Sequence, residues 1–280
     1  MGVSNSITDQ EFSYPDGSRT VPVRCYEPTG EPRGWILFSV GYGGNRDGYA
    51  FLARAWTELG LAVVVTEHVG SNLEVLKSFS QLRRAERNAE VVRRVHDPDE
   101  LRARVHDIHL VYGELSAFYF GLPFGLAGHS YGSYSALAGC GMESNLAPHS
   151  LGALPVDSLL VVSPQPPDTL FSSQEYTKVH CPCLVLTGSE DHLLDGSSTF
   201  RERMKVFESL TESERHLLVL KGVEHMTFAG IGLKVEAQLA AISSATSVWW
   251  EDSLLESGHS RAWPERLGEK LDSDWILECR

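Results

Sequence analysis

The 280-residue chain has no long apolar run and no surplus of positive charge. Its longest apolar stretches, such as 61–65 and 159–162, are far shorter than the roughly 20 residues that a membrane helix needs. Its 24 Lys and Arg residues face 37 Asp and Glu residues, and the resulting net charge of −13 repels phosphate. We therefore expect neither a membrane span nor a nucleic-acid partner.

Cysteines are few and odd in number: Cys25, Cys140, Cys181, Cys183 and Cys279. The first residues also lack the basic and apolar regions of a secretory signal, which predicts a reduced protein of the cytoplasm. The spacing Cys181-Pro182-Cys183 differs from that of a CxxC pair, and no second cluster of Cys and His accompanies it. We expect no metal site and no cofactor.

Short apolar runs typical of buried strands alternate along the chain with patterns typical of helices. Strands are expected at 35–40, 61–66, 124–129, 158–163, 184–187 and 217–220, and helices at 49–59, 97–118 and 131–140. This order predicts an α/β protein with a mostly parallel central sheet and helices on both faces. The turn residues of 14–18 predict an N-terminal hairpin whose second strand carries Val21, Val23 and Cys25 on one face.

Two segments depart from this alternation. Residues 72–95 are rich in Arg and Glu and carry Leu73, Leu76 and Phe79 at helical spacing, which predicts a small helical insert. We expect this insert to be a lid or a wall of the active site, because the stretch 164–182 is too short for a large cap. Residues 246–280 hold four of the six tryptophans and have little strand character. Helices packed on the body are expected there, with a homodimer surface as the alternative. The whole chain, 1–280, is expected to form one domain.

Residues Gly128-His129-Ser130-Tyr131-Gly132 match the G-x-S-x-G nucleophile elbow and end the predicted strand at 124–129. An elbow places a serine Oγ on a sharp turn between strand and helix, and its two glycines remove side chains that would collide there. Small residues such as Ser133, Ser135 and Ala136 suit the closely packed helix that follows. Ser130 is therefore the candidate nucleophile.

A serine nucleophile needs a histidine base and a carboxylate to orient it, and elbow proteins carry them in the order Ser, acid, His. Asp191 follows the strand at 184–187 and His225 follows the strand at 217–220, each three residues beyond a glycine. This agreement in order and offset predicts Asp191 as the acid and His225 as the base. Alternatives lie nearby: Glu190, Asp195 and Asp168 for the acid, and His216, His192 and His129 for the base.

Acyl transfer also needs N–H donors for the oxyanion. In an elbow the residue after the nucleophile supplies one donor, so the backbone N–H of Tyr131 is expected to serve here. The glycine-rich loop Val40-Gly41-Tyr42-Gly43-Gly44 follows another strand and lacks the GxxxxGK signature of a phosphate loop. Its glycines allow backbone amides to turn inward, and the N–H of Tyr42 is the expected second donor.

These motifs together resemble the α/β-hydrolase superfamily, and within it the predicted dienelactone-hydrolase and platelet-activating-factor-acetylhydrolase-like branch. The resemblance runs from about Val21 to Ala240. It rests on Ser39-Val-Gly-Tyr-Gly-Gly44, on His68-Val-Gly-Ser-Asn72, on the elbow, and on the loops that carry Asp191 and His225. The resemblance implies the α/β-hydrolase fold. Authentic dienelactone hydrolases use a cysteine nucleophile, so Ser130 favours ester hydrolysis instead. Tyr42 also resembles the aromatic oxyanion residue of cutinase-like polyester hydrolases.

The sequence thus predicts a serine esterase that acts on a small-molecule or polymeric ester through Ser130, His225 and Asp191. A cutinase-like polyester hydrolase, or a thioesterase, lactonase, amidase or perhydrolase on the same triad, is an alternative. Another class of protein is a further alternative, namely a hydrolase-like protein that binds a ligand with little turnover, because a fold does not determine a function.

Overall fold

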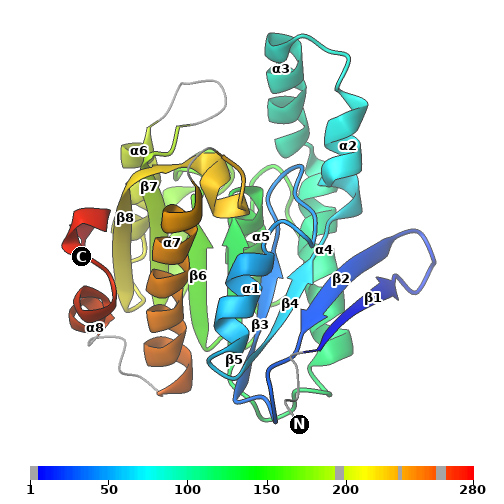
Figure 1. Ribbon diagram of the computed structural model, residues 1–280. Helices are drawn as coiled ribbons and strands as arrows, with labels where there is room; N and C mark the ends of the chain where they lie inside the picture. The colour runs from blue at the N-terminus through cyan, green and yellow to red at the C-terminus, as the bar shows by residue number, and fades with distance from the viewer. Residues whose placement is uncertain (1–5, 193–198, 233–234, 257–262) are drawn as a thin grey trace.

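The computed structural model describes residues 6–192, 199–232, 235–256 and 263–280, which form a nine-stranded sheet (Figure 1). The strands are β1 (Ile7–Ser13), β2 (Thr20–Tyr26), β3 (Gly34–Ser39), β4 (Leu61–Thr66), β5 (Phe124–His129), β6 (Ser158–Val162), β7 (Cys183–Glu190), β8 (Arg215–Glu224) and β9 (Ile276–Cys279). Their order across the sheet is β1-β2-β4-β3-β5-β6-β7-β8-β9. The six central strands, from β4 to β8 in that order, are parallel, whereas β1, β2 and β9 pair antiparallel at the two edges.

Helices cover both faces of the sheet, as predicted. They are α1 (Ala50–Thr57), α2 (Leu73–Ser78), α3 (Arg84–Val95), α4 (Pro98–Leu115), α5 (Tyr131–Gly139), α6 (Phe200–Ser209), α7 (Val235–Trp250) and α8 (Trp263–Lys270). In Figure 1, α1 and α7 lie on the near face, and α4, α5 and α6 lie behind the sheet. Successive strand residues point to opposite faces, so Leu37 joins the apolar cluster under α4 and α5, whereas Ile36 joins the one under α1 and α7.

The N-terminal hairpin forms as predicted. β1 pairs antiparallel with β2, and Val21, Val23 and Cys25 are fully or almost fully buried. β2 in turn pairs with β4, so the hairpin extends the sheet at one edge. The alternation of partly buried and buried residues along β2 follows the two-residue period of a strand with one covered face.

The C-terminal segment packs against the protein's own core. Trp249, Trp250 and Trp263 are completely buried in the cluster that α1 and α7 share. The prediction of little strand character there was wrong, because Ile276–Cys279 form β9 and pair antiparallel with β8. Four residues at a sheet edge bury too little apolar surface to show a clear strand pattern in sequence. A homodimer through this segment stays a prediction.

The insert, residues 72–95, contains α2 and α3 and rises above the carboxyl end of the sheet (Figure 1). The side chain of Asn72 caps α2 by accepting a hydrogen bond from the N–H of Val75 at 3.2 Å.

No helix in the described ranges is both long enough and apolar enough to cross a membrane.

Candidate active site

Ser130 stands on the sharp turn between β5 and α5. Its φ of 54° and ψ of −121° are unusual for a residue with a side chain. A Cβ on Gly128 would lie 2.1 Å from the carbonyl oxygen of Gly132, and a Cβ on Gly132 would lie 1.9 Å from that of Ser39. The turn therefore closes only because both flanking residues are glycine, which is the geometry expected of a nucleophile elbow.

Three residues predicted for catalysis meet at the carboxyl edge of the parallel strands. Nε2 of His225 lies 2.9 Å from Oγ of Ser130, and its Nδ1 lies 2.8 Å from Oδ1 of Asp191. Ser130 follows β5, Asp191 follows β7 and His225 follows β8. Because neighbouring parallel strands end at the same edge, residues far apart in sequence come within hydrogen-bond distance of one another.

Asp191 is completely buried and receives several hydrogen bonds. Its Oδ2 accepts hydrogen bonds from the hydroxyls of Ser163 and Thr187, the latter at 2.8 Å. Burial alone would raise the pKa of Asp191, but the hydrogen bond from His225 and the nearby charge of Arg203 hold it well below its usual value. Asp191 is therefore ionised at neutral pH and suited to hold a positively charged imidazole.

Arg203, on α6, is the cation beside this carboxylate. Its Nε lies 3.1 Å from Oδ1 of Asp191, and its Nη2 lies 3.4 Å from Nδ1 of His225. Its Nη1 donates to the carbonyl oxygens of Ser163 and Pro164, both at 2.9 Å. The buried guanidinium thus joins the acid and the histidine to the loop that follows β6.

The alternative acids have other surroundings. Asp168 accepts hydrogen bonds from the N–H and hydroxyl of Ser173 at 2.8 and 2.9 Å, which fixes a local turn. Glu190 is exposed and faces His192 at 3.7 Å. Asp195 lies outside the described residues.

The alternative bases also lie apart from Ser130 Oγ. His216 is buried against the rings of Trp249 and Trp263, and His192 is half exposed. His129 is buried beneath the elbow, where its Nδ1 lies 2.9 Å from the hydroxyl of Tyr49. Burial, together with the neighbouring His225, holds the pKa of His129 well below its usual value, so this ring is neutral.

The loop 40–44 is held by its neighbours on both sides of Tyr42. The N–H of Gly41 donates to the Tyr49 hydroxyl at 3.2 Å, and the N–H of Gly43 donates to the carbonyl of Ser71 at 2.7 Å. Within the part of the chain that the structure describes, no acceptor engages the N–H of Tyr42. This amide is therefore available to a ligand.

Gln165, in the loop after β6, lies over the peptide that joins Ser130 to Tyr131. In the orientation that satisfies both neighbours, its amide nitrogen donates to the Ser130 carbonyl and its oxygen accepts from the Tyr131 N–H, both at 3.2 Å. The side-chain oxygen of Gln165 thus occupies the N–H of Tyr131. A substrate carbonyl that binds the same N–H has to displace the Gln165 side chain.

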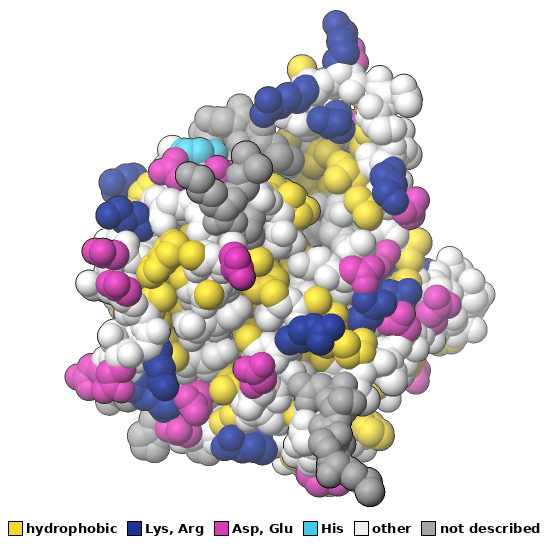
Figure 2. Space-filling view, in the orientation of Figure 1, with side chains coloured by type: hydrophobic (Ala, Val, Ile, Leu, Met, Phe, Trp, Pro, Cys, Tyr) yellow, Lys and Arg dark blue, Asp and Glu magenta, His cyan; other side chains and the backbone are white. Residues whose placement is uncertain are grey.

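A pocket of about 200 Å³ opens beside Ser130 and His225. Leu73 and Leu76 of the insert form one side of it, and Met226, Ala229 and Ile231 form another. Figure 2 shows hydrophobic side chains in the hollow between the insert and the body of the molecule. Among the described residues that line the pocket, none is Asp, Glu, Lys or Arg. The site is therefore suited to an uncharged, apolar group.

Three residues around Asp191 were missed in the sequence. Ser163 directly follows the apolar strand β6, and Thr187 directly follows the apolar residues Leu184, Val185 and Leu186 of β7, so a polar residue just after an apolar run is a usable signal. Arg203 has no such signal, because it stands among the polar residues of α6 and resembles any arginine on a helix surface. Only its contacts distinguish it.

In sequence, the chain matches no protein-family model and no curated protein. In structure, it is similar to a dienelactone hydrolase from Anabaena variabilis ATCC 29413, with a TM-score of 0.56 and 18% identity. That similarity covers 89% of this chain and 99% of the other. The chain is also similar to the esterase domain of a Rhodothermus marinus protein, with a TM-score of 0.58 and 14% identity. This second similarity covers 88% of this chain and 98% of the other. The mostly parallel sheet and these likenesses show that the chain has the α/β-hydrolase fold.

Proposed function

We propose that this protein is a serine hydrolase that cleaves carboxylic esters through an acyl-enzyme intermediate. The observation that carries the proposal is the aligned pair of contacts from His225, 2.9 Å to Ser130 Oγ and 2.8 Å to Asp191 Oδ1. Similarity in fold to a dienelactone hydrolase and to an esterase domain supports a hydrolase. The serine nucleophile and the uncharged pocket favour an ester over the dienelactone reaction.

In the first half of the reaction, Ser130 Oγ attacks the ester carbonyl while His225 Nε2 takes the hydroxyl proton. Asp191 holds the Nδ1–H tautomer of His225 and stabilises the imidazolium that forms. The oxyanion of the tetrahedral intermediate accepts hydrogen bonds from the N–H groups of Tyr42 and Tyr131. His225 then donates its proton to the leaving alcohol, and the acyl group stays on Ser130.

In the second half, water replaces the alcohol. His225 takes a proton from that water, the resulting hydroxide attacks the acyl carbonyl, and the same two N–H groups bind the second oxyanion. Collapse of this intermediate breaks the acyl–Oγ bond, and His225 returns its proton to Ser130. The carboxylic acid leaves, and no other reactant is consumed.

The pocket supports a substrate with a compact, uncharged acyl group. Its volume of about 200 Å³ holds several methylene-sized groups. Its apolar lining, which includes Leu73, Leu76 and Ile231, offers no described cation to pair with a carboxylate. We expect neutral esters with short or medium-length acyl groups to be better substrates than esters whose acyl group carries a negative charge.

The test is covalent labelling by a fluorophosphonate combined with hydrolysis of p-nitrophenyl butyrate. The native protein is expected to show both, and Ser130→Ala to lose labelling and about a millionfold in kcat. Ser150→Ala, which changes an exposed serine, serves as the matched control and is expected to behave as the native protein. Hydrolysis retained by Ser130→Ala would overturn the proposal.

A substrate panel separates the remaining alternatives. Matched thioester, lactone, anilide and polyester substrates are compared by kcat/KM with the ester. A higher kcat/KM for one of them moves the assignment to that reaction on the same three residues. Labelling without turnover of any substrate supports instead a ligand-binding protein of this fold.

A further inference from the structure

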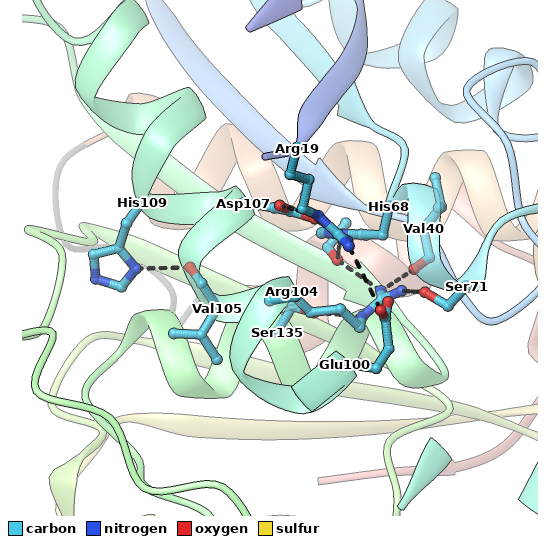
Figure 3. A network of polar contacts seen from close by, with 12 residues as sticks. Arg19, Val40, His68, Ser71, Glu100, Arg104, Val105, Asp107, His109 and Ser135 are labelled. Atoms are coloured by element: carbon cyan, nitrogen blue, oxygen red, sulfur yellow. Dashed lines mark hydrogen bonds and ion pairs between the residues drawn. The ribbon is translucent and has the colours of Figure 1, made fainter. Parts of the chain in front are cut away.

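Arg104, on α4, is a completely buried arginine directly beneath the loop 40–44 (Figure 3). Its Nε donates to the Ser135 hydroxyl at 3.0 Å, and its Nη1 donates to the Ser71 hydroxyl at 2.7 Å. Its Nη2 donates to the Ser39 hydroxyl at 3.2 Å and also to the carbonyl of Val40. A buried guanidinium is costly to desolvate, and its direct partners here are four neutral oxygens. Its position therefore suggests a role other than simple stabilisation.

The first side of this cluster holds the loop just before and just after Tyr42. The carbonyl of Val40, two residues before Tyr42, accepts a hydrogen bond from Arg104. Ser71 accepts from Arg104 through its hydroxyl and from the N–H of Gly43 through its carbonyl. The peptide that joins Val40 to Gly41 is thus tied directly to one rigid planar group, and the peptide that joins Tyr42 to Gly43 is tied to it through Ser71.

The second side fixes the start of α5. The Cζ of Arg104 lies 4.3 Å from the centre of the Tyr131 ring, a cation–π distance. Ser135 is one turn further along the same helix and accepts from Nε. The guanidinium therefore contacts both segments that carry the proposed oxyanion donors, the loop with Tyr42 and the helix that begins at Tyr131.

A second array, of Asp107, His68 and Ser39, holds one acceptor of this cluster in place, the hydroxyl of Ser39. Figure 3 labels Asp107 and His68 beside Arg104. Nδ1 of His68 lies 2.8 Å from Oδ2 of Asp107, and its Nε2 lies 2.8 Å from Oγ of Ser39. Because the Nδ1–H of the neutral ring donates to the carboxylate, Nε2 accepts a hydrogen bond from the Ser39 hydroxyl. The oxygen of Ser39 then presents a lone pair to Arg104.

This second array does not act on a substrate, because Ser39, His68 and Asp107 are all completely buried. The N-terminal hairpin closes it from the other side. Arg19 donates from Nε and Nη2 to the two oxygens of Asp107, both at 2.8 Å, and the Tyr14 hydroxyl donates to Oδ1 at 2.7 Å. Arg19 also lies 3.6 Å from Glu100. Each member of the array is thus oriented by the next.

We propose that Arg104 is a positioning residue that sets the distance between the two oxyanion donors, the N–H groups of Tyr42 and Tyr131. The inference rests on the proposed function. It predicts that Arg104 contributes to binding of the tetrahedral intermediate and little to binding of the substrate itself, because only the intermediate carries the oxyanion.

The test compares Arg104→Met with the native protein. Methionine keeps an unbranched apolar side chain in place of the aliphatic part of arginine and removes the charge and all donors. Active sites are counted by fluorophosphonate labelling, and kcat, KM and the inhibition constant of butylboronic acid, which forms a tetrahedral adduct with serine, are measured. We expect kcat to fall by about 10- to 1000-fold, boronate affinity to fall in step with it, and KM to change less than about threefold.

Two further variants keep the result interpretable. Ser71→Ala removes one of the four acceptors of Arg104, together with the contact of that hydroxyl with Glu100. It is expected to show the same split between kcat and KM at a few-fold size, so it decides the role of Arg104 if Arg104→Met does not fold. Arg266→Met is the control, because the carboxylates with which Arg266 on α8 pairs, among them the buried one of Asp252, lie outside the loop 40–44 and outside α5. It is expected to lower stability and leave kcat per labelled site unchanged.

The outcomes distinguish this inference from the proposed function. If the native protein is neither labelled at Ser130 nor active, the proposed function fails. If the native protein is labelled and active but Arg104→Met or Ser71→Ala keeps its kcat and boronate affinity per labelled site, only the role of Arg104 is overturned. Equal losses in kcat and substrate binding also overturn it, because they indicate a general structural defect.

Discussion

The Nε of Arg203 lies 3.1 Å from Oδ1 of Asp191. The same oxygen lies 2.8 Å from Nδ1 of His225, so one carboxylate oxygen serves both a guanidinium and the imidazole of the candidate base. Asp191 therefore shares its negative charge between two partners. A carboxylate shared in this way stabilises an imidazolium less than an unshared one does.

The stability of Arg203 variants tests this relationship. Arg203→Met removes the guanidinium beside the buried carboxylate of Asp191 and the donors to the carbonyls of Ser163 and Pro164. Because one partner of a buried ion pair is lost, we expect the free energy of unfolding, measured in urea at pH 7, to fall by about 3–5 kcal/mol. Arg203→Lys, which keeps the charge, is expected to lose less. An unchanged free energy of unfolding in Arg203→Met would mean that Asp191 does not depend on the cation beside it.

Gly43 is expected to matter for activity because of its place against the insert. Its φ is +73°, and a Cβ there would lie 2.5 Å from Cδ2 of Leu76. Gly43→Ala should cost about 1–2 kcal/mol in stability through the backbone and also push aside the side chain of Leu76, which lines the pocket beside Ser130. Gly17→Ala is the matched control, because Gly17 has a φ of +70° with no atom near the added Cβ. We expect both variants to lose stability, measured as Tm, and only Gly43→Ala to lose kcat; similar kcat values would contradict a role for the contact between Gly43 and Leu76.

Leu76 is expected to limit the length of the acyl group. It lines the pocket from the insert, and Leu76→Ala enlarges the space beside Ser130. With p-nitrophenyl esters of increasing chain length, we expect the optimum of kcat/KM to shift to longer chains, by about fourfold for each methylene newly accommodated. Leu82→Ala changes an exposed leucine of the same insert and is expected to keep the native preference. An unchanged preference in Leu76→Ala would place the acyl group elsewhere.

Acid sensitivity of the fold is expected to arise in part at His68. Burial and then the charge of Arg104 lower the pKa of His68 from 6.5 to about 4. Between these values the unfolded chain binds a proton that the folded protein does not, so the stabilisation is present above pH 6.5 and is lost as the pH falls toward 4. The shift corresponds to roughly 3 kcal/mol.

Urea unfolding of the native protein and of His68→Gln between pH 4 and pH 7 measures this contribution. Glutamine does not titrate, so the variant should be less stable at pH 7 but lose less stability on acidification. If the two free energies of unfolding run parallel over this range, His68 is not the group responsible.

Most of the fold could be predicted from patterns that lie within a few residues of one another. The apolar runs at 35–40, 61–66 and 124–129 became β3, β4 and β5 at nearly the predicted bounds, because parallel strands buried on both faces require continuous apolar sequence. The elbow was equally local, since the collision that excludes a side chain at Gly128 comes from Gly132, four residues away. β9 was missed because a four-residue edge strand with a charged Glu278 carries too little of that pattern.

The meeting of Ser130, Asp191 and His225 could be anticipated for a similar reason. Each follows a strand, and parallel strands deliver the residues after them to one edge of the sheet. No comparable rule could identify Arg203 and Arg104, because both lie within helices. Their partners come from other elements, such as Asp191 for Arg203 and Ser39 for Arg104. The sequence of a helix does not show whether a given arginine faces the protein interior or the solvent. The chain alone therefore specified its strands, its elbow and its candidate reacting groups, because short-range sterics and burial act on neighbouring residues. The surroundings of Asp191 and of the two proposed oxyanion donors came from packing, because they depend on contacts between helices and loops that no local pattern records.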